Sequence, residues 1–123
     1  MSFLDRLPER WHERLLSIAT ERELAPGEVL LRRGDAGGDF FLVLSGELEV
    51  VDTRSSPPRI ADLLTEGKLV GELSFIDRSP RSMDVRAHSP TRLLVWRRTR
   101  VREVLGAEPP LAAAVFEALA QVA

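Results

Sequence analysis

The sequence predicts a mainly β domain, an antiparallel sandwich or barrel with helices at both ends. Short apolar runs recur between about residues 24 and 98, and glycine or proline separates most of them. Such runs with regular turn signals are typical of antiparallel all-β architectures. Outside this region, apolar residues recur at the spacing of amphipathic helices. We therefore expect one domain over residues 1–123, with an N-terminal helix at about 7–20, a β-roll at about 24–98 and C-terminal helices at about 99–122.

The helices are predicted from apolar spacing and from residues that begin or end a helix. The first is expected from Pro8 to about Thr20, because proline suits the first turn. After the last apolar run, helical spacing returns. Gly106 is the expected C-cap of the second helix, and Pro109 is expected to start the third.

The strands are predicted from the apolar runs between turn residues. These runs are Val29–Leu31, Phe40–Leu44, Leu48–Val51, Ile60–Leu64, Met83–Ala87 and Leu93–Trp96. Ser45-Gly46 lies between two of them and predicts a tight hairpin. Ser55–Pro58 predicts an exposed loop tip.

Composition argues against several function classes. The chain has no cysteine, which excludes disulfides, thiolate catalysis and cysteine metal sites. Its net charge of −2 argues against a general nucleic-acid surface, and we interpret the basic run Arg97–Arg100 as the solvated start of a helix. No apolar run approaches the roughly 20 residues that span a bilayer, and no signal-peptide pattern is found. We expect a cytoplasmic protein that binds neither membrane nor nucleic acid.

The segment from Gly71 to Ser82 carries the strongest functional signal. Backbone N–H groups at the start of a helical turn attract anions, and the fork of Arg81 fits two phosphate oxygens. Glu72 only accepts hydrogen bonds, so it suits a sugar hydroxyl. Together these residues predict a binding site for a small molecule with one phosphate and one ribose, such as a cyclic mononucleotide.

The segments Pro26–Val50, Gly67–Ser74 and Pro80–Ser82 together strongly resemble the cyclic nucleotide-binding domain family. That family includes the regulatory subunits of cAMP-dependent protein kinase, gated ion channels and bacterial catabolite-activator transcription factors. The resemblance covers roughly Leu4 to Val122. It implies an eight-stranded antiparallel jelly roll, or double-stranded β-helix, with helices before and after it. It also implies that residues 71–82 form the family's phosphate-binding cassette.

The resemblance assigns ligand-binding roles to six residues of the cassette. They are Gly71, Glu72, Leu73, Ser74, Arg81 and Ser82. By position, Glu72 would accept the ribose 2′-hydroxyl and Arg81 would pair with the cyclic phosphate. The amides of Leu73 and Ser74 would face the phosphate, Ser82 would touch phosphate or base, and Gly71 would allow close backbone approach.

Three features depart from the family pattern. Val70 stands where an aromatic residue usually precedes the Gly-Glu pair, and Met83 and Asp84 stand where small residues and threonine are favoured. Asp84 is tolerable if its strand face meets solvent and unfavourable if that face lines the pocket. The last helix is shorter than the family's usual lid. The base would be capped by a partner subunit, by Leu111, Val115 and their neighbours, or by nothing.

These observations predict a sensor or regulatory module and not an enzyme. The expected ligand is cAMP, with cGMP second, and no cofactor or metal is expected. The module would signal to an unidentified protein partner through its C-terminal helices. The apolar stripe Leu111, Val115 and Leu119 predicts either a homodimer contact or packing on the roll.

Two other classes stay open. The alternative is a degenerate domain that acts as a protein-interaction module without binding nucleotide. A jelly-roll metalloenzyme is a third hypothesis, which the dispersed His12 and His88 make poor.

Overall fold

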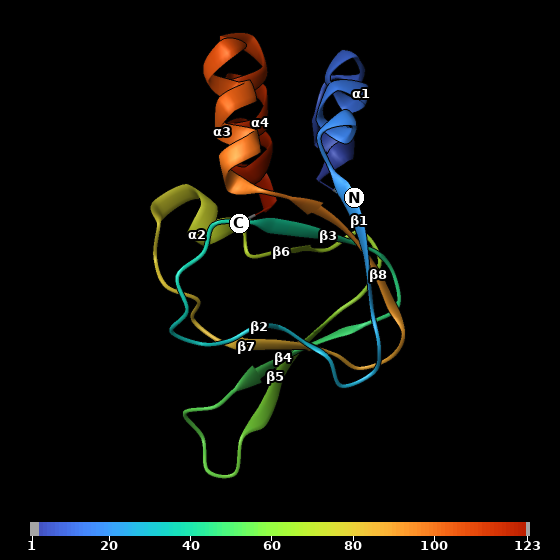
Figure 1. Ribbon diagram of the computed structural model, residues 1–123, viewed down its shortest axis with the longest axis vertical. Helices are drawn as coiled ribbons and strands as arrows, with labels where there is room; N and C mark the ends of the chain where they lie inside the picture. Colours follow the sequence, from blue (N-terminus) through green and yellow to red (C-terminus); the bar gives the residue numbers. More distant parts are fainter. Residues whose placement is uncertain (1–2, 123) are drawn as a thin grey trace.

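The computed structural model describes residues 3–122, and this part of the chain forms eight strands in two four-stranded antiparallel sheets. The strand orders are β1-β8-β3-β6 and β2-β7-β4-β5. The strands are β1 (Thr20–Leu24), β2 (Val29–Leu31), β3 (Phe40–Ser45), β4 (Leu48–Asp52), β5 (Arg59–Leu64), β6 (Leu69–Val70), β7 (Asp84–Ala87) and β8 (Thr91–Trp96). The two sheets form the predicted jelly roll (Figure 1).

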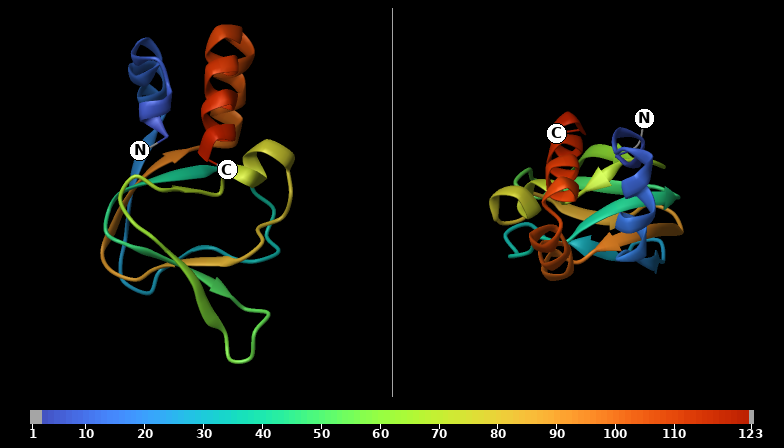
Figure 2. Two further views of the ribbon diagram at one scale, coloured as in Figure 1. Left: turned by 180° about the vertical axis from the view of Figure 1, so that it is seen from behind. Right: turned by 90° about the horizontal axis from the view of Figure 1, so that it is seen from above.

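Helices precede, interrupt and follow the roll. They are the 3-10 helix η1 (Leu4–Arg6) and the α-helices α1 (Glu9–Ser17), α2 (Glu72–Asp77), α3 (Arg98–Ala107) and α4 (Pro109–Val122). The helices α1, α3 and α4 lie at one end of the roll, and the β4–β5 hairpin projects from the other end (Figure 1). Seen from behind, α2 lies beside the roll, below α4 (Figure 2). No helix within residues 3–122 is long and apolar enough to cross a membrane.

Two clusters of buried side chains hold the fold together. The roll core lies between the sheets and contains Leu24, Phe41, Val43, Leu48, Val70, Val85, Ala87, Leu93 and Val95. The helix core joins the helices to the first sheet and contains Phe3, Leu7, Leu15, Phe40, Leu42, Phe75, Trp96, Val101, Val104, Leu105, Leu111, Val115, Ala118 and Leu119. Strand β3 supplies both cores, because alternate side chains of a strand point to opposite faces.

The predicted end of the first helix and start of the roll are wrong. Helix α1 ends at Ser17, and Thr20 already begins β1, which pairs with β8 along its whole length. Leu24 is the one buried side chain in β1; the other side chains are exposed. The strand therefore lacks an apolar alternation and depends on its backbone pairing.

Two predicted turns are also wrong. Ser45-Gly46 does not form a hairpin, because β3 and β4 belong to different sheets. Gly46 has a φ of 88°, and a Cβ there would lie 2.3 Å from the carbonyl oxygen of Pro90, so this is a tight corner between the sheets. Gly106 does not cap a helix, because α3 continues through Ala107.

Candidate functional site

A cavity of about 430 Å³ lies against α2 and has all six predicted ligand-binding residues in its wall. The cassette supplies Gly71, Glu72, Leu73, Ser74, Arg81 and Ser82. The apolar part of the wall includes Leu31, Val50, Leu64, Leu69, Val70, Pro80, Met83 and Val85. This volume suits a small molecule, and the mixture of apolar walls with a few convergent polar groups is typical of ligand sites.

A second cavity, of about 520 Å³, shares Arg81 with the first but contains none of the other five predicted residues. Its wall comes mainly from β1, β2 and the loop that precedes β3. The first cavity is the better candidate, because it alone joins Arg81 to Glu72 and to the start of α2.

Arg81 is a buried cation whose observed partners are neutral. Its side chain is 6% exposed, its Nη1 donates to the carbonyl oxygen of Gly71 at 3.1 Å, and its Nη2 donates to that of Asp39 at 2.8 Å. It forms no ion pair with any residue in the described range 3–122. Burial lowers the pKa of the guanidinium, while the charges of Asp39 and Glu72 raise it. A buried charge is costly without a charged partner, so this arrangement favours an anionic ligand.

Two glycines make room for the Arg81 guanidinium. A Cβ at Gly37 would lie 2.8 Å from Nη2, and a Cβ at Gly71 would lie 2.7 Å from Nη1. Gly71 also has a φ of 81°, in the left-handed region that favours glycine. The sequence predicted Gly71, but the contributions of Gly37 and Asp39 were missed. The consecutive glycines at 37 and 38 were the available signal.

Glu72 is the first residue of α2 and is half-buried. Burial raises the pKa of its carboxyl, and its own backbone N–H and the charge of Arg81 partly oppose that rise. The first amides of any helix lack partners within the helix, so those of Leu73 and Ser74 lie at its donor end. Ser74 is buried, whereas Leu73 is 55% exposed and Ser82 is exposed.

Two of the residues that depart from the family pattern, Val70 and Asp84, have structural explanations, and the third, Met83, belongs to the cavity wall. Val70 is buried in the roll core, opposite Phe41 on β3. Asp84 does not line the cavity, because its carboxylate accepts a hydrogen bond from the backbone N–H of Arg33 at 2.8 Å. A different acidic residue, Asp62 on β5, belongs to the cavity wall, and no pattern in the sequence indicated it.

Helix α4 packs on its own chain. Leu111, Val115 and Leu119 are fully buried in the helix core, so this stripe is not a free dimer surface. No residue from the described part of α4 lines the cavity. The helix instead contacts the cassette through Phe116, whose ring is stacked with that of Phe75 at a centroid distance of 6.1 Å.

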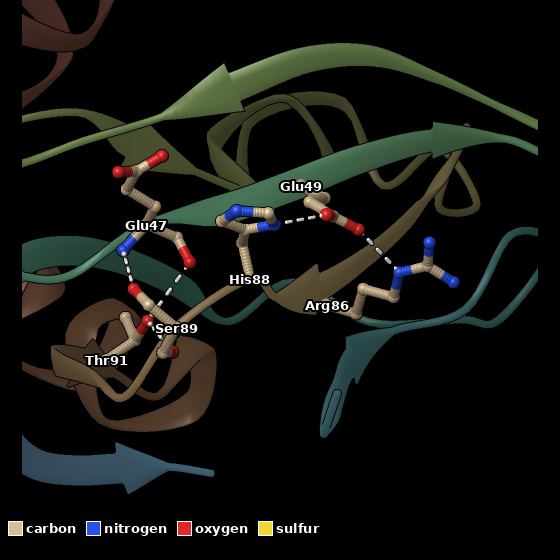
Figure 3. A network of polar contacts seen from close by, with 6 residues as sticks. All are labelled: Glu47, Glu49, Arg86, His88, Ser89 and Thr91. Carbon is tan, nitrogen blue, oxygen red and sulfur yellow. Dashed lines mark hydrogen bonds and ion pairs between the residues drawn. The ribbon is translucent and has the colours of Figure 1, made fainter. Parts of the chain in front are cut away.

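The two histidines lie apart from the cavity. His12 Nε2 bonds to the carbonyl oxygen of Leu7 at 2.8 Å, and His88 Nδ1 lies 2.5 Å from Oε1 of Glu49 (Figure 3). Within residues 3–122, no group of three or more histidine, cysteine or acidic residues is placed to hold a metal ion. The structure therefore adds no support to the metalloenzyme hypothesis.

Comparison with known proteins gives a consistent result. The family described as "Cyclic nucleotide-binding domain" matches residues 21–108. A cAMP-dependent protein kinase regulatory subunit from Mycosarcoma maydis is 31% identical over 57% of this chain. The match spans 13% of the length of that relative.

Solved structures show the same similarity. A cyclic nucleotide-binding domain from Methylobacillus flagellatus has a TM-score of 0.88 and 26% identity, covering 98% of this chain and 71% of that one. The regulatory domain of Toxoplasma gondii PKA, crystallised with cAMP, has a TM-score of 0.75 and 26% identity, covering 83% of this chain and 40% of that one.

Proposed function

The chain belongs to the cyclic nucleotide-binding domain family, and from this premise we propose that it is a regulatory module that binds a cyclic mononucleotide in the cavity beside α2. The observation that carries the proposal is the burial of Arg81 between neutral carbonyl groups. A cyclic phosphate would supply the missing negative charge. The first candidate ligand is cAMP, which one similar protein carries in its name and with which another was crystallised, and cGMP is the second.

Each polar group of the cavity has a proposed role. Arg81 would bind two phosphate oxygens, and the amides of Leu73 and Ser74 would complete the cradle. Glu72 would accept the ribose 2′-hydroxyl, and Ser82 would contact phosphate or base. The apolar wall around Val70 would receive the less polar parts of the nucleotide. Burying a phosphate is costly without compensation, so Arg81 should provide much of the affinity.

The cavity favours binding over catalysis. The residues in its wall include serines but, within the described chain, no histidine that would act as a general base toward them. The polar groups instead supply donors for an anion and an acceptor for a hydroxyl. We propose that the protein is a sensor and not an enzyme.

The signal would leave through the C-terminal helices. The cassette touches α4 through the Phe75–Phe116 contact. The cassette is also linked to α3 through Asp39, whose carbonyl accepts from Arg81 while its Oδ1 accepts from the backbone N–H of Arg98 at 2.9 Å. The C-terminal helices would have two positions relative to the roll. Ligand would shift the equilibrium between these positions only as far as its affinity differs between them. A protein partner would recognise the changed helical surface.

Calorimetric titration with cAMP, cGMP and 5′-AMP tests the proposal. We expect a cyclic nucleotide to bind with micromolar or tighter affinity, and Arg81→Ala to lose about 2–5 kcal/mol of binding free energy, as when one partner of a buried charge pair is removed. Arg92→Ala is the matched control, because Arg92 is an exposed arginine that pairs with Glu21. Its affinity should equal that of the wild type.

The contrary result would favour the interaction module. Absence of both heat and a thermal shift at millimolar cyclic nucleotide would contradict the sensor. The observation behind the alternative is the exposure of Leu73, Ile76 and Phe116, large apolar side chains of α2 and α4 that would suit a protein partner.

A further inference from the structure

Arg98, the first residue of α3, has a partly buried side chain that lacks a partner. Its Nε and Nη2 atoms are shielded from solvent and make no hydrogen bond within the described chain. The side chain lies against Gly38, where a Cβ would come within 2.2 Å of the Arg98 Cδ. The prediction of a solvated basic helix start is therefore wrong for this residue, because the second of the consecutive glycines admits its side chain beside the backbone.

The charges of two further arginines affect the pKa of Arg98. Burial is the largest cause that lowers the pKa of Arg98, and the charges of Arg102 and Arg78 lower it further. Both of these residues are exposed, and neither side chain forms a hydrogen bond or ion pair among residues 3–122. Arg78 caps α2 with a φ of 60°, held by its backbone N–H bond to the Ser74 carbonyl at 3.0 Å.

Asp39, whose carboxylate bonds to the backbone of Arg98, forms no ion pair with the side chains of Arg78, Arg98 or Arg102. It uses Oδ1 to accept from the backbone N–H of Arg98, and its Oδ2 lies 3.9 Å from Nη1 of Arg97. The Nε and Nη2 atoms of Arg98 make no bond to either oxygen. The cluster of Arg78, Arg98 and Arg102 thus has three positive charges and no ion-pair partner in the described chain.

We propose that Arg78, Arg98 and Arg102 form a second anion site, which takes a small oxyanion of the phosphate class. Arg78 and Arg102 are exposed, so an anion would reach them from solvent, and the partly buried Arg98 would add its charge. Guanidinium forks match phosphate oxygens, and a bound phosphate would supply the missing countercharge. None of these three arginines lines either of the two cavities that contain Arg81, so the second anion site is separate from the first.

The proposed second anion site would link α2 to α3. Arg78 ends α2, and Arg98 begins α3. An oxyanion held by both would fasten the cassette to the C-terminal helices. Phosphate would thus act on the same elements as the proposed cyclic nucleotide, from a different position.

Thermal unfolding of the full chain in phosphate and in chloride, at equal ionic strength, tests the site. We expect saturating inorganic phosphate to raise Tm by about 4 °C. Arg78→Gln and Arg102→Gln should each weaken phosphate binding about tenfold or more, because each removes charged hydrogen bonds. The matched control is Arg100→Gln, on the same helix, since Arg100 already pairs with Glu103 at 2.9 Å. This control should keep the wild-type shift.

Two further variants distinguish anion binding at this cluster from phosphate binding at Arg81 and from a structural role of Arg98. Arg81→Ala should keep the phosphate shift, whether or not cyclic nucleotide binding is lost. Arg98→Met should raise Tm in chloride, because it removes a charge whose Nε and Nη2 are shielded and unpartnered, and should abolish the phosphate shift. An arginine with a merely structural role would instead lower Tm in both buffers when it is replaced.

Three results would contradict the proposed site at Arg78, Arg98 and Arg102. The proposal is wrong if wild type shows no phosphate shift, if Arg78→Gln and Arg102→Gln both keep it, or if Arg81→Ala alone removes it. Titration with inorganic phosphate and with glycerol 3-phosphate identifies the source of the oxyanion. Tighter binding of inorganic phosphate supports the free ion, and tighter binding of the ester supports a phosphorylated metabolite.

Discussion

Arg81 is held by backbone groups of its own chain at both its main chain and its guanidinium. Its backbone N–H donates to the Asp35 carbonyl at 2.9 Å, and its own carbonyl accepts from the Gly34 N–H at 2.7 Å. Its guanidinium is held by carbonyl oxygens of Gly71 and Asp39. A group held in this way loses little side-chain entropy when it binds, which favours affinity.

A methyl group at Gly37 should weaken ligand binding without unfolding the chain. Gly37→Ala would place a Cβ 2.8 Å from Nη2 of Arg81, and the guanidinium would have to move. We expect the affinity for cAMP to fall about tenfold, the loss of roughly one charged hydrogen bond. Calorimetry measures the affinity, and circular dichroism checks the fold.

Gly106→Ala is the control for this substitution. A Cβ at Gly106 meets no atom within 4 Å, and Gly106 lies inside α3. Alanine there should leave the affinity unchanged and stabilise the helix by about 0.5–1 kcal/mol. An unchanged affinity in Gly37→Ala would show that Arg81 adapts freely and that the glycine gap is unimportant.

Some residues of the site could be predicted from one short sequence motif, and others could not. Gly71, Glu72 and Arg81 fall within one short motif, so their joint placement could be predicted from the sequence. Asp39 lies 42 residues from Arg81 along the chain and contributes a carbonyl group that every residue has. Its role depends on how β3 and the loop before it are placed, which residue types alone do not specify.

At the scale of elements, a buried carboxylate ties β4 to β7. Glu49 is 7% exposed, and its carboxylate accepts from Nε of Arg86 at 2.7 Å and contacts His88 (Figure 3). The hydrogen bond from Arg86, followed by that from His88, holds the pKa of Glu49 below its ordinary value of 4.5. A carboxyl with a lowered pKa stabilises the fold above its ordinary value, and this contribution is lost as pH falls through the lowered pKa.

Acid should therefore unfold the wild type more steeply than Glu49→Gln. Urea unfolding at a series of values from about pH 6 to about pH 3 measures the free energy of unfolding across the window in which such a carboxyl titrates. Glu49→Gln should be less stable at the upper end and should show a shallower loss toward the lower end. Glu23→Gln, at an exposed residue of β1, serves as the control. Parallel curves for wild type and Glu49→Gln would contradict this role.

Strand existence was easier to predict than strand pairing. The apolar runs of β3 and β4 are strong local signals. Whether two neighbouring strands pair or cross to another sheet depends on contacts distant in sequence, and the Ser45-Gly46 prediction failed for that reason. Strand β1 was missed because the side chains of Glu21 and Glu23 meet solvent and leave no apolar pattern.

At the scale of the whole molecule, β3 makes the two cores one structure. Phe40 and Leu42 belong to the helix core, and Phe41 and Val43 belong to the roll core. Detachment of β3 from its sheet would therefore disrupt the packing of both cores. The family resemblance predicted the roll and its flanking helices, but this division of one strand between two cores follows from the observed topology.

We expect the chain to unfold in one cooperative transition. Leu42→Ala should lower the free energy of unfolding by about 2–5 kcal/mol, as for other buried leucines. Tryptophan fluorescence follows the helix core through Trp96, and amide hydrogen exchange in β7 follows the roll. Both probes should shift together. Protection of β7 that outlasts the fluorescence transition would mean that the cores unfold separately.

The neighbouring glycines at 37 and 38 each leave space for a different arginine, Arg81 and Arg98. Glycine codons become alanine codons through a single base change. A descendant of this gene could therefore lose its response to one anion and keep its response to the other, with every arginine still in place. In related proteins, alanine in place of glycine at one of these two positions would indicate which anion response has been lost.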